Sequence, residues 1–178
     1  MAKATYHIPC GGLPPQSKRL ADRAVFTESF AFIPGDVQTD IVPIFLSFWQ
    51  ETRLWVLARP MTGFAETFSH YLMEVGAGGG SQQPENDPAA QSVLFFVGGS
   101  ATISFGGKQA ELAPGSYVYL PAGLDWQLEN TFSSPCHFHW IRKRYHRVAG
   151  IEVPQAFVTS DMDVAPIAMP DTDGIWST

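Results

Sequence analysis

Two histidines separated by a single residue are the first candidates for chemistry in this sequence. His137 and His139 flank Phe138 in a segment rich in aromatic and β-branched residues, and alternate residues of a β-strand point to the same face. Two imidazoles on one face can hold zinc when a third ligand lies near, and His70 or His146 could supply it. Such a pair more often has one histidine satisfied within the fold and the other at an interface, and we expect that arrangement here.

A run of basic residues, from Arg142 to Arg147, follows this pair. It could bind an anionic ligand through a carboxylate. The other interpretation, which we favour, is a solvated strand end, or salt bridges to the acidic tail or to a partner domain. The whole chain has 11 Lys and Arg against 17 Asp and Glu, a net charge of −6. It therefore lacks the basic face that nucleic-acid binding needs.

Other reaction chemistries find no support in the sequence. The glycine run 76–80 lacks the third glycine of a dinucleotide fingerprint, and Pro84 and Pro88 prevent the helix that would face a phosphate. We expect a flexible loop there. No G-x-S-x-G motif and no Cys–His pairing indicates a nucleophile. The tryptophans expected to serve as core or interface aromatics are Trp49, Trp55, Trp126 and Trp140.

Short strands must position these residues, because 16 Gly and 14 Pro break the chain and no long helical stripe of apolar residues exists. Gly106-Gly107 is typical of a two-residue hairpin turn. Strands recurring about every 8–12 residues predict an all-β antiparallel sandwich or barrel. We expect an irregular N-terminal arm over residues 1 to about 35, one domain over 1–160 and a linker-like tail over 161–178. The expected strands are 44–48, 53–58, 66–75, 92–97, 101–105, 108–112, 116–120, 125–129 and 136–144.

A spaced motif lies between Gly115 and Asn130. It reads Gly115, five residues, Pro121, one residue, Gly123, two residues, Trp126, three residues, Asn130. This pattern resembles the second conserved motif of the cupin superfamily, in which a metal-binding histidine stands at the position of Trp126. The resemblance implies a cupin barrel of the jelly-roll type, whose glycines and proline occupy turns at its edge.

The first cupin motif lacks its metal ligands in this sequence. The family pattern has two histidines and a glutamate, but residues 76–99 contain no histidine, and the glutamate position falls on Gln91 or Ser92. A first-row metal needs about three or four N, O or S ligands, and neutral amides replace them poorly. We therefore expect no metal here, with Gln91 and Trp126 at ligand positions. The residues expected to line a small-ligand pocket are Gln82, Gln83, Gln91, Tyr119, Trp126 and His139.

The order of segments along nearly the whole chain resembles the N-terminal half of the bicupin (S)-ureidoglycine aminohydrolases. The resemblance implies a place in allantoin and purine catabolism, where the whole enzyme releases ammonia with the help of manganese. It places the manganese and the catalytic residues in a second, C-terminal cupin, so it assigns no catalytic residue and no cofactor to this chain. The segments that carry the resemblance are 19–25, 71–75, 79–83, 115–121 and 142–145.

Two functions remain open from the sequence. The chain is a structural cupin half that packs against a second cupin domain or in a homo-oligomer, or it is a stand-alone cupin that binds a small ureido or organic acid without catalysis. A hydrophobic fraction of 45% with only 16% charged residues favours self-association. We expect no nucleic-acid or membrane partner.

The expected location is the cytoplasm. The chain shows no secretory signal and no apolar run of the ~20 residues that a membrane span needs. Its two cysteines, Cys10 and Cys136, are expected to be reduced thiols rather than a disulfide.

Overall fold

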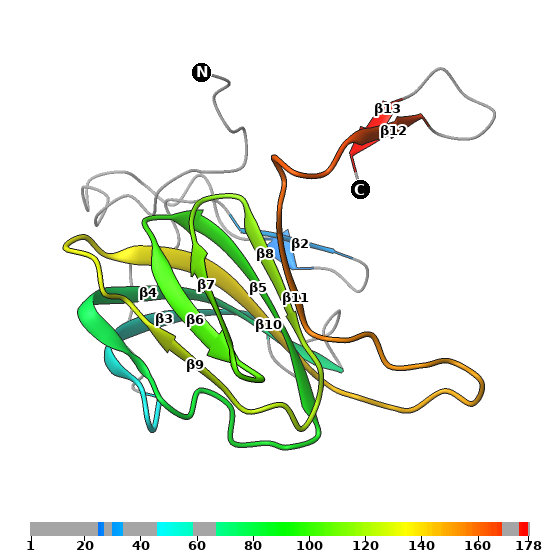
Figure 1. The fold of residues 1–178 in the computed structure, drawn as a ribbon, viewed down its shortest axis with the longest axis horizontal. Helices are drawn as coiled ribbons and strands as arrows, with labels where there is room; N and C mark the ends of the chain where they lie inside the picture. The colour runs from blue at the N-terminus through cyan, green and yellow to red at the C-terminus, as the bar shows by residue number, and fades with distance from the viewer. Residues whose placement is uncertain (1–24, 27–29, 34–45, 59–66, 169–174, 178) are drawn as a thin grey trace.

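The antiparallel β-structure expected from the turn spacing is confirmed. The computed structural model describes residues 25–26, 30–33, 46–58, 67–168 and 175–177, and all the elements within these ranges are β-strands. Nine of these strands form a nearly closed barrel (Figure 1). In these ranges no helix is long and apolar enough to cross a membrane.

The barrel is one nine-stranded sheet that folds over at its longest strand. The strand order is β11-β8-β5-β10-β4-β9-β6-β7, and β3 also pairs with β4. The first part of β4 pairs with β10, whereas its last two residues, Gly80 and Ser81, pair with β9. A large layer (β3, β4, β10, β5, β8, β11) therefore faces a small layer (the end of β4, β9, β6, β7). The strands are β3 Gln50–Ala58, β4 Phe68–Ser81, β5 Ala90–Gly98, β6 Ala101–Phe105, β7 Lys108–Leu112, β8 Ser116–Leu120, β9 Trp126–Glu129, β10 Cys136–Arg144 and β11 Phe157–Ser160.

Two short strand pairs lie outside this sheet. β1 (Val25–Phe26) pairs with β2 (Ala31–Phe32), and β12 (Pro166–Ala168) pairs with β13 (Ile175–Ser177). The second pair falls within the segment expected to be a linker-like tail, and Figure 1 shows it apart from the barrel. Most of the expected N-terminal arm lies outside the described residues.

The hairpin turn predicted between β6 and β7 is confirmed. Gly106 and Gly107 have φ values of 53° and 74°, the positive range that a type I′ turn requires at both central positions. The expected strand at 44–48 is wrong over residues 46–48, where a turn precedes β3, and its first two residues lie outside the described part.

The expectation of a loop over the glycine run is also wrong, because β4 continues through it to Ser81. The reason is a close approach between backbones. A Cβ on Gly80 would lie 2.1 Å from the carbonyl oxygen of Leu128, and Gly80 pairs with Glu129 on β9. Glycine lets the two layers join at this point, since it has no side chain to separate them.

The core lies between the two layers. Alternate residues of each strand point inward, as the burial pattern of β10 shows: Cys136, Phe138 and Trp140 are buried, whereas His137 and His139 are not fully buried. Burial raises the pKa of the free Cys136 thiol to about 12. Cys10 lies outside the described residues.

Asn130, the last residue of the spaced motif, holds the edge of the barrel together. It is fully buried, and its side-chain amide donates hydrogen bonds to the carbonyl oxygens of Val75 and Ser134, each at 2.9 Å. Its side-chain oxygen accepts one from the backbone N–H of Phe132 at 3.0 Å. A buried amide whose hydrogen-bonding groups are satisfied fixes the turn after β9 against β4.

Candidate functional site

The interior position of the metal-binding histidine is occupied by packed indoles. Trp126 opens β9 and is only 4% exposed. Its ring lies 6.4 Å from that of Trp49 and 6.0 Å from that of Trp140, both edge to face, and Trp49 lies 5.6 Å from Trp140. Edge-to-face contacts at these distances are favourable between aromatic rings. The expected role of these three tryptophans as core aromatics agrees with this packing.

The polar atoms of this cluster are used within the fold. The indole N–H of Trp49 donates to the carbonyl oxygen of Pro84 at 3.3 Å, and that of Trp140 donates to the hydroxyl of Ser92 at 3.0 Å. Ser92 is one of the two residues at the glutamate position of the first motif, and it points inward. Gln91, the other one, points outward and accepts a hydrogen bond from the Tyr119 hydroxyl at 2.9 Å.

The residues in this interior do not fit a metal ion. The inward-facing positions carry two indoles, Trp126 and Trp140, and a hydroxyl that already accepts a hydrogen bond, Ser92. Among the described residues there is no group of three His, Cys, Asp or Glu side chains that could hold a metal ion. A metal would need several such ligands converging on one point.

The loop between β4 and β5 lies over the end of the barrel where Trp49 contacts Pro84, and ion pairs join this loop to β10. Glu85 in the loop between β4 and β5 forms a two-contact ion pair with Arg142, and Asp87 accepts a hydrogen bond from Arg144 at 2.9 Å. The Arg142 guanidinium also lies 5.0 Å from the centre of the Trp140 ring. Burial disfavours the charge of Arg142, but Glu85 outweighs it and raises the Arg142 pKa.

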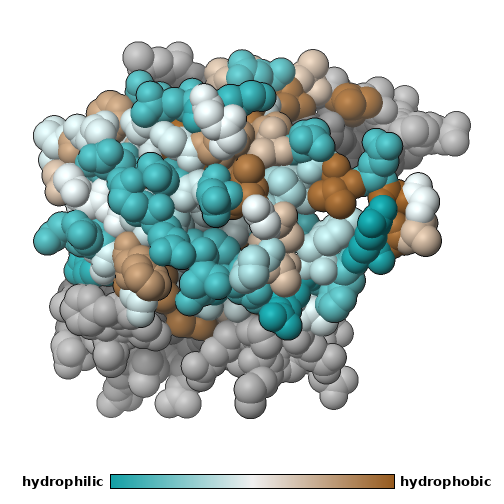
Figure 2. All heavy atoms as spheres, turned by 60° about the horizontal axis from the view of Figure 1, so that its bottom comes forward, coloured by the Kyte–Doolittle hydropathy of each residue, from teal (hydrophilic) through white to brown (hydrophobic). Residues whose placement is uncertain are grey.

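The basic run is therefore engaged by ion pairs at Arg142 and Arg144. Their partners lie in the loop after β4, rather than in the acidic tail that the sequence suggested. Figure 2 turns this lower end of the barrel toward the viewer, and its surface is largely hydrophilic with scattered hydrophobic side chains. The two ion pairs fix the loop across the barrel end.

His137 and His139 share a face of β10, as expected, but they serve different partners. This is the outer face of the large layer. His137 lies 2.9 Å from the carboxylate of Glu74, which also pairs with Arg53, and His139 lies 2.9 Å from His70. His146 is not brought to either histidine by any contact among the described residues.

Electrostatics separate these two pairs. Burial, followed by repulsion from His139, lowers the pKa of His70 from 6.5 to about 4, and burial also lowers the pKa of His139. Burial opposes ionisation of Glu74, but hydrogen bonds from His137 and Arg53 outweigh it and lower the Glu74 pKa. The His70–His139 pair is therefore neutral at neutral pH, whereas Glu74 is ionised.

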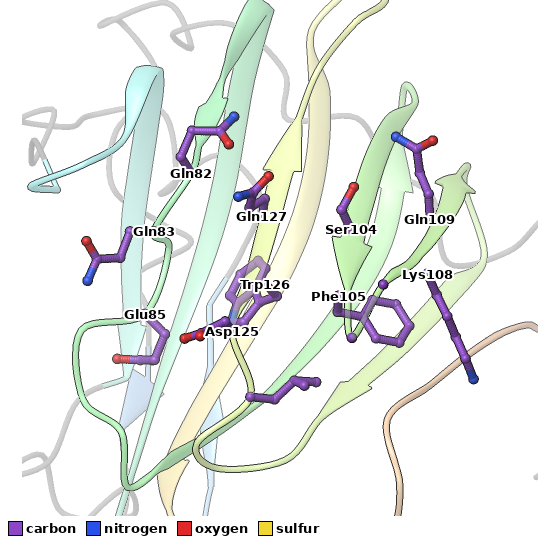
Figure 3. A pocket seen from close by; sticks show the side chains of 13 residues that line it. Gln82, Gln83, Glu85, Ser104, Phe105, Lys108, Gln109, Asp125, Trp126 and Gln127 are labelled. Carbon is purple, nitrogen blue, oxygen red and sulfur yellow. The ribbon is translucent and has the colours of Figure 1, made fainter.

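A polar hollow lies beside the covered end of the barrel, on the small layer. It has a volume of about 640 Å³, and Figure 3 shows its side chains. Of the six residues expected to share a ligand pocket, Gln82, Gln83 and Trp126 line it. Gln91, Tyr119 and His139 do not, because they lie on the outer face of the large layer.

Several residues of the hollow were not predicted from the sequence. The main ones are Ser104 on β6, Gln109 on β7 and Gln127 on β9. The signal was the alternation of polar and apolar residues along these three strands, which marks one polar face. Their strand register then places them side by side, since Ser104 pairs with both Gln109 and Gln127.

Comparisons with known proteins agree with this architecture. Residues 71–142 match the family model described as "Cupin domain". A solved structure of a provisionally assigned glyoxylate-induced protein from Pseudomonas aeruginosa is 47% identical, with a TM-score of 0.82 over 96% of this chain and 62% of that one. Protein Ylba from E. coli is similar in fold, at 23% identity and a TM-score of 0.72 over 83% of this chain and 59% of that one.

This chain therefore spans 62% and 59% of the lengths of those two structures. No curated protein matches the chain. The barrel, the strand order and the matching family model together establish that the chain contains a cupin domain.

Proposed function

We propose that this chain is the metal-free N-terminal half of a two-cupin protein related to the (S)-ureidoglycine aminohydrolases, and that its role is structural. In this proposal it packs against a second cupin domain that holds the manganese and performs the hydrolysis. The observation that carries the proposal is that Trp126, at a metal-ligand position of the cupin pattern, packs against Trp49 and Trp140. A barrel filled in this way has no open coordination position for a substrate.

The lengths of the similar structures support a second domain. The 47%-identical protein extends well beyond the part that this chain matches. In this chain β11 pairs with β8, and the backbone N–H of Asp161 donates to the carbonyl oxygen of Gly115 at 3.1 Å. Residues after this contact no longer belong to the barrel sheet, so the proposed domain limit lies near residue 160.

The outer face of the large layer is the proposed packing surface. Phe157 on β11 is 42% exposed, and its ring lies 5.9 Å from Tyr117 and 5.8 Å from Tyr119. Val93 and Ile141 lie on the same face and are only partly buried. Removal of these partly covered aromatic and aliphatic side chains from water by a second domain would stabilise the assembled protein.

The test is ammonia release from freshly generated (S)-ureidoglycine. The 178-residue chain is compared with a longer two-cupin relative at the same manganese concentration. We expect the longer protein to turn over and the short chain to show only the spontaneous rate. Turnover by the short chain that is lost on His139→Ala would overturn the structural role.

The packing role has a separate readout. The second half of the longer relative, produced as its own chain, should be retained by this chain in solution, and Phe157→Glu should weaken that retention. The matched control is Gln155→Ala, which changes an exposed polar residue on the same segment. Equal retention by the Phe157→Glu variant would exclude this face as the packing surface.

A further inference from the structure

The outer face of the small layer carries two rows of polar side chains. Strand register places Gln127, Ser104 and Gln109 side by side across β9, β6 and β7. The next outward positions on the same strands form a second row, which consists of Glu129, Thr102 and Glu111. These six positions contain no apolar side chain and no cation.

Two hollows follow this face. The hollow of about 640 Å³ contains the first row, and a second hollow of about 360 Å³ contains Gly78–Gly80, Glu129 and Phe48. Gln82 and Gln83 line both, so the two hollows adjoin at these residues. Figure 3 shows Gln82, Gln127, Ser104 and Gln109 one after another across the first hollow.

Phe48 is an unusual residue at the end of this surface. Its side chain is 59% exposed, and its backbone has φ of 71°. A residue other than glycine in this left-handed region costs about 1–3 kcal/mol, and such strain concentrates at ligand-binding sites. An aromatic ring that is neither buried in the core nor relaxed in its backbone is displayed beside the amide side chains.

The amide side chains are free to bind a ligand. No side-chain hydrogen bond joins Gln82, Gln83, Gln109 or Gln127 to another residue in the described part of the chain. Each glutamine amide has an NH₂ group that donates hydrogen bonds and an oxygen that accepts them, and a hydroxyl group can also donate and accept. A ligand that alternates donors and acceptors along its length matches such a surface.

The charges decide the class of ligand. Among the described residues that line the hollows, Glu85, Asp125 and Glu129 are acidic and Lys108 is the one cation. Of the three carboxylates, Glu85 is already paired with Arg142. This balance disfavours phosphates and carboxylates, since like charges repel. The neutral amide row and the exposed ring favour an uncharged molecule with hydroxyl groups and an apolar C–H face.

We propose that this surface binds a neutral oligosaccharide, with Phe48 stacking on one sugar ring and Gln127, Ser104 and Gln109 hydrogen-bonding to hydroxyls of others. Neighbouring strands are about 4.8 Å apart, so the row from Gln127 to Gln109 spans about 10 Å across three strands. That span is comparable to two linked sugar rings. The site is independent of the barrel interior and goes beyond the structural role proposed above.

The experiment is a ¹H–¹⁵N NMR titration of the full chain with cellohexaose, maltohexaose and xylohexaose, one at a time, without added metal. We expect at least one of them to produce saturable shifts at residues 102–109 and 127–129 and in the glutamine side-chain amides. Gln127→Ala and Gln109→Ala should each weaken binding about 3- to 10-fold, the effect of one lost hydrogen bond. Gln155→Ala, at an exposed glutamine on the tail side, should leave binding unchanged.

Phe48→Gly separates stacking from backbone strain. Glycine relaxes the positive φ, so the variant should be as stable as the natural chain or more so, yet it should lose at least tenfold in affinity. Absence of shifts with all three neutral sugars at millimolar concentration would overturn the proposal. So would binding of trigalacturonic acid alone, or affinities that the Phe48 and glutamine variants leave unchanged.

Discussion

Replacing Trp126 by alanine tests whether the indole cluster has taken the place of a metal centre. The Trp126 side chain is 4% exposed and packs edge to face on Trp49 and Trp140. Its removal leaves a space bounded by two other indoles, whose own N–H groups are fixed by hydrogen bonds to Pro84 and Ser92. The space can therefore collapse only in part.

The expected cost is large for a single substitution. Truncation of a buried aromatic residue to alanine costs about 3–5 kcal/mol, and the two aromatic contacts place Trp126 toward the upper part of that range. For a domain of this size, each kcal/mol lowers Tm by about 2–4 °C, so we expect a fall of roughly 10 °C or more. Gln127→Ala, one residue along β9 with its side chain outward, should cost about 0.5 kcal/mol or less.

Thermal unfolding followed by circular dichroism measures these changes. A second variant, Trp126→His, is measured in the same way. This variant restores the histidine of the family pattern without restoring the other ligands. We expect it to be destabilised as well and to gain nothing from manganese. A bound ion at about 100 times its Kd would instead add ~2.7 kcal/mol. A change of Tm within about 2 °C for Trp126→Ala, below the effect of 1 kcal/mol, or a manganese-dependent rise in Tm for Trp126→His would show that the indole cluster has not replaced a metal centre.

Three further predictions concern the contacts around the barrel. His70 takes up a proton near pH 6.5 when unfolded but only near pH 4 when folded, so stability is full above pH 6.5 and should fall by about 3 kcal/mol between those values. Urea unfolding across that pH range measures the fall. If the free energy of unfolding depends on pH equally in His70→Gln, groups other than His70 cause the fall. Arg142→Ala removes the countercharge of the Glu85 carboxylate, which keeps only a hydrogen bond from the backbone N–H of Asp87, and should cost about 1–3 kcal/mol. Adding Glu85→Gln should recover part of that loss. If the same unfolding assay shows no recovery, the loss does not come from the Glu85 charge left without Arg142. The isolated chain should self-associate at micromolar concentration through the outer face of the large layer, and Phe157→Glu should shift it toward monomer in sedimentation; a clean monomer before substitution would count against an unpartnered face.

Local sequence signals predicted most of the barrel. The strands at 101–105, 108–112, 116–120 and 136–144 have the bounds expected from turn chemistry, because their Gly and Pro residues act on their immediate neighbours. The glycines of β4 do not mark a loop, because they act on a residue that is distant in the sequence. Their purpose is the close contact of Gly80 with Leu128, a residue far away in sequence, and only the paired strands reveal it.

The candidate site was harder to predict because one residue of register changes the face of a strand. The sequence could not choose between Gln91 and Ser92 at the glutamate position, and the structure places Ser92 inside and Gln91 outside. The sequence therefore could not show that Gln91 bonds to Tyr119 on the outer face and does not share a hollow with Gln82. The partners of His137 and His139, which come from β4, also depend on pairing over more than 60 residues.

The metal content of the purified chain shows whether its barrel interior holds a metal ion. The chain is dialysed extensively against buffer without chelator, and manganese, zinc and iron are measured by elemental analysis against protein concentration. Because indoles occupy the interior where metal ligands would lie, we expect far less than one bound metal ion per chain, with and without prior exposure to manganese. A value close to one ion per chain would contradict this expectation.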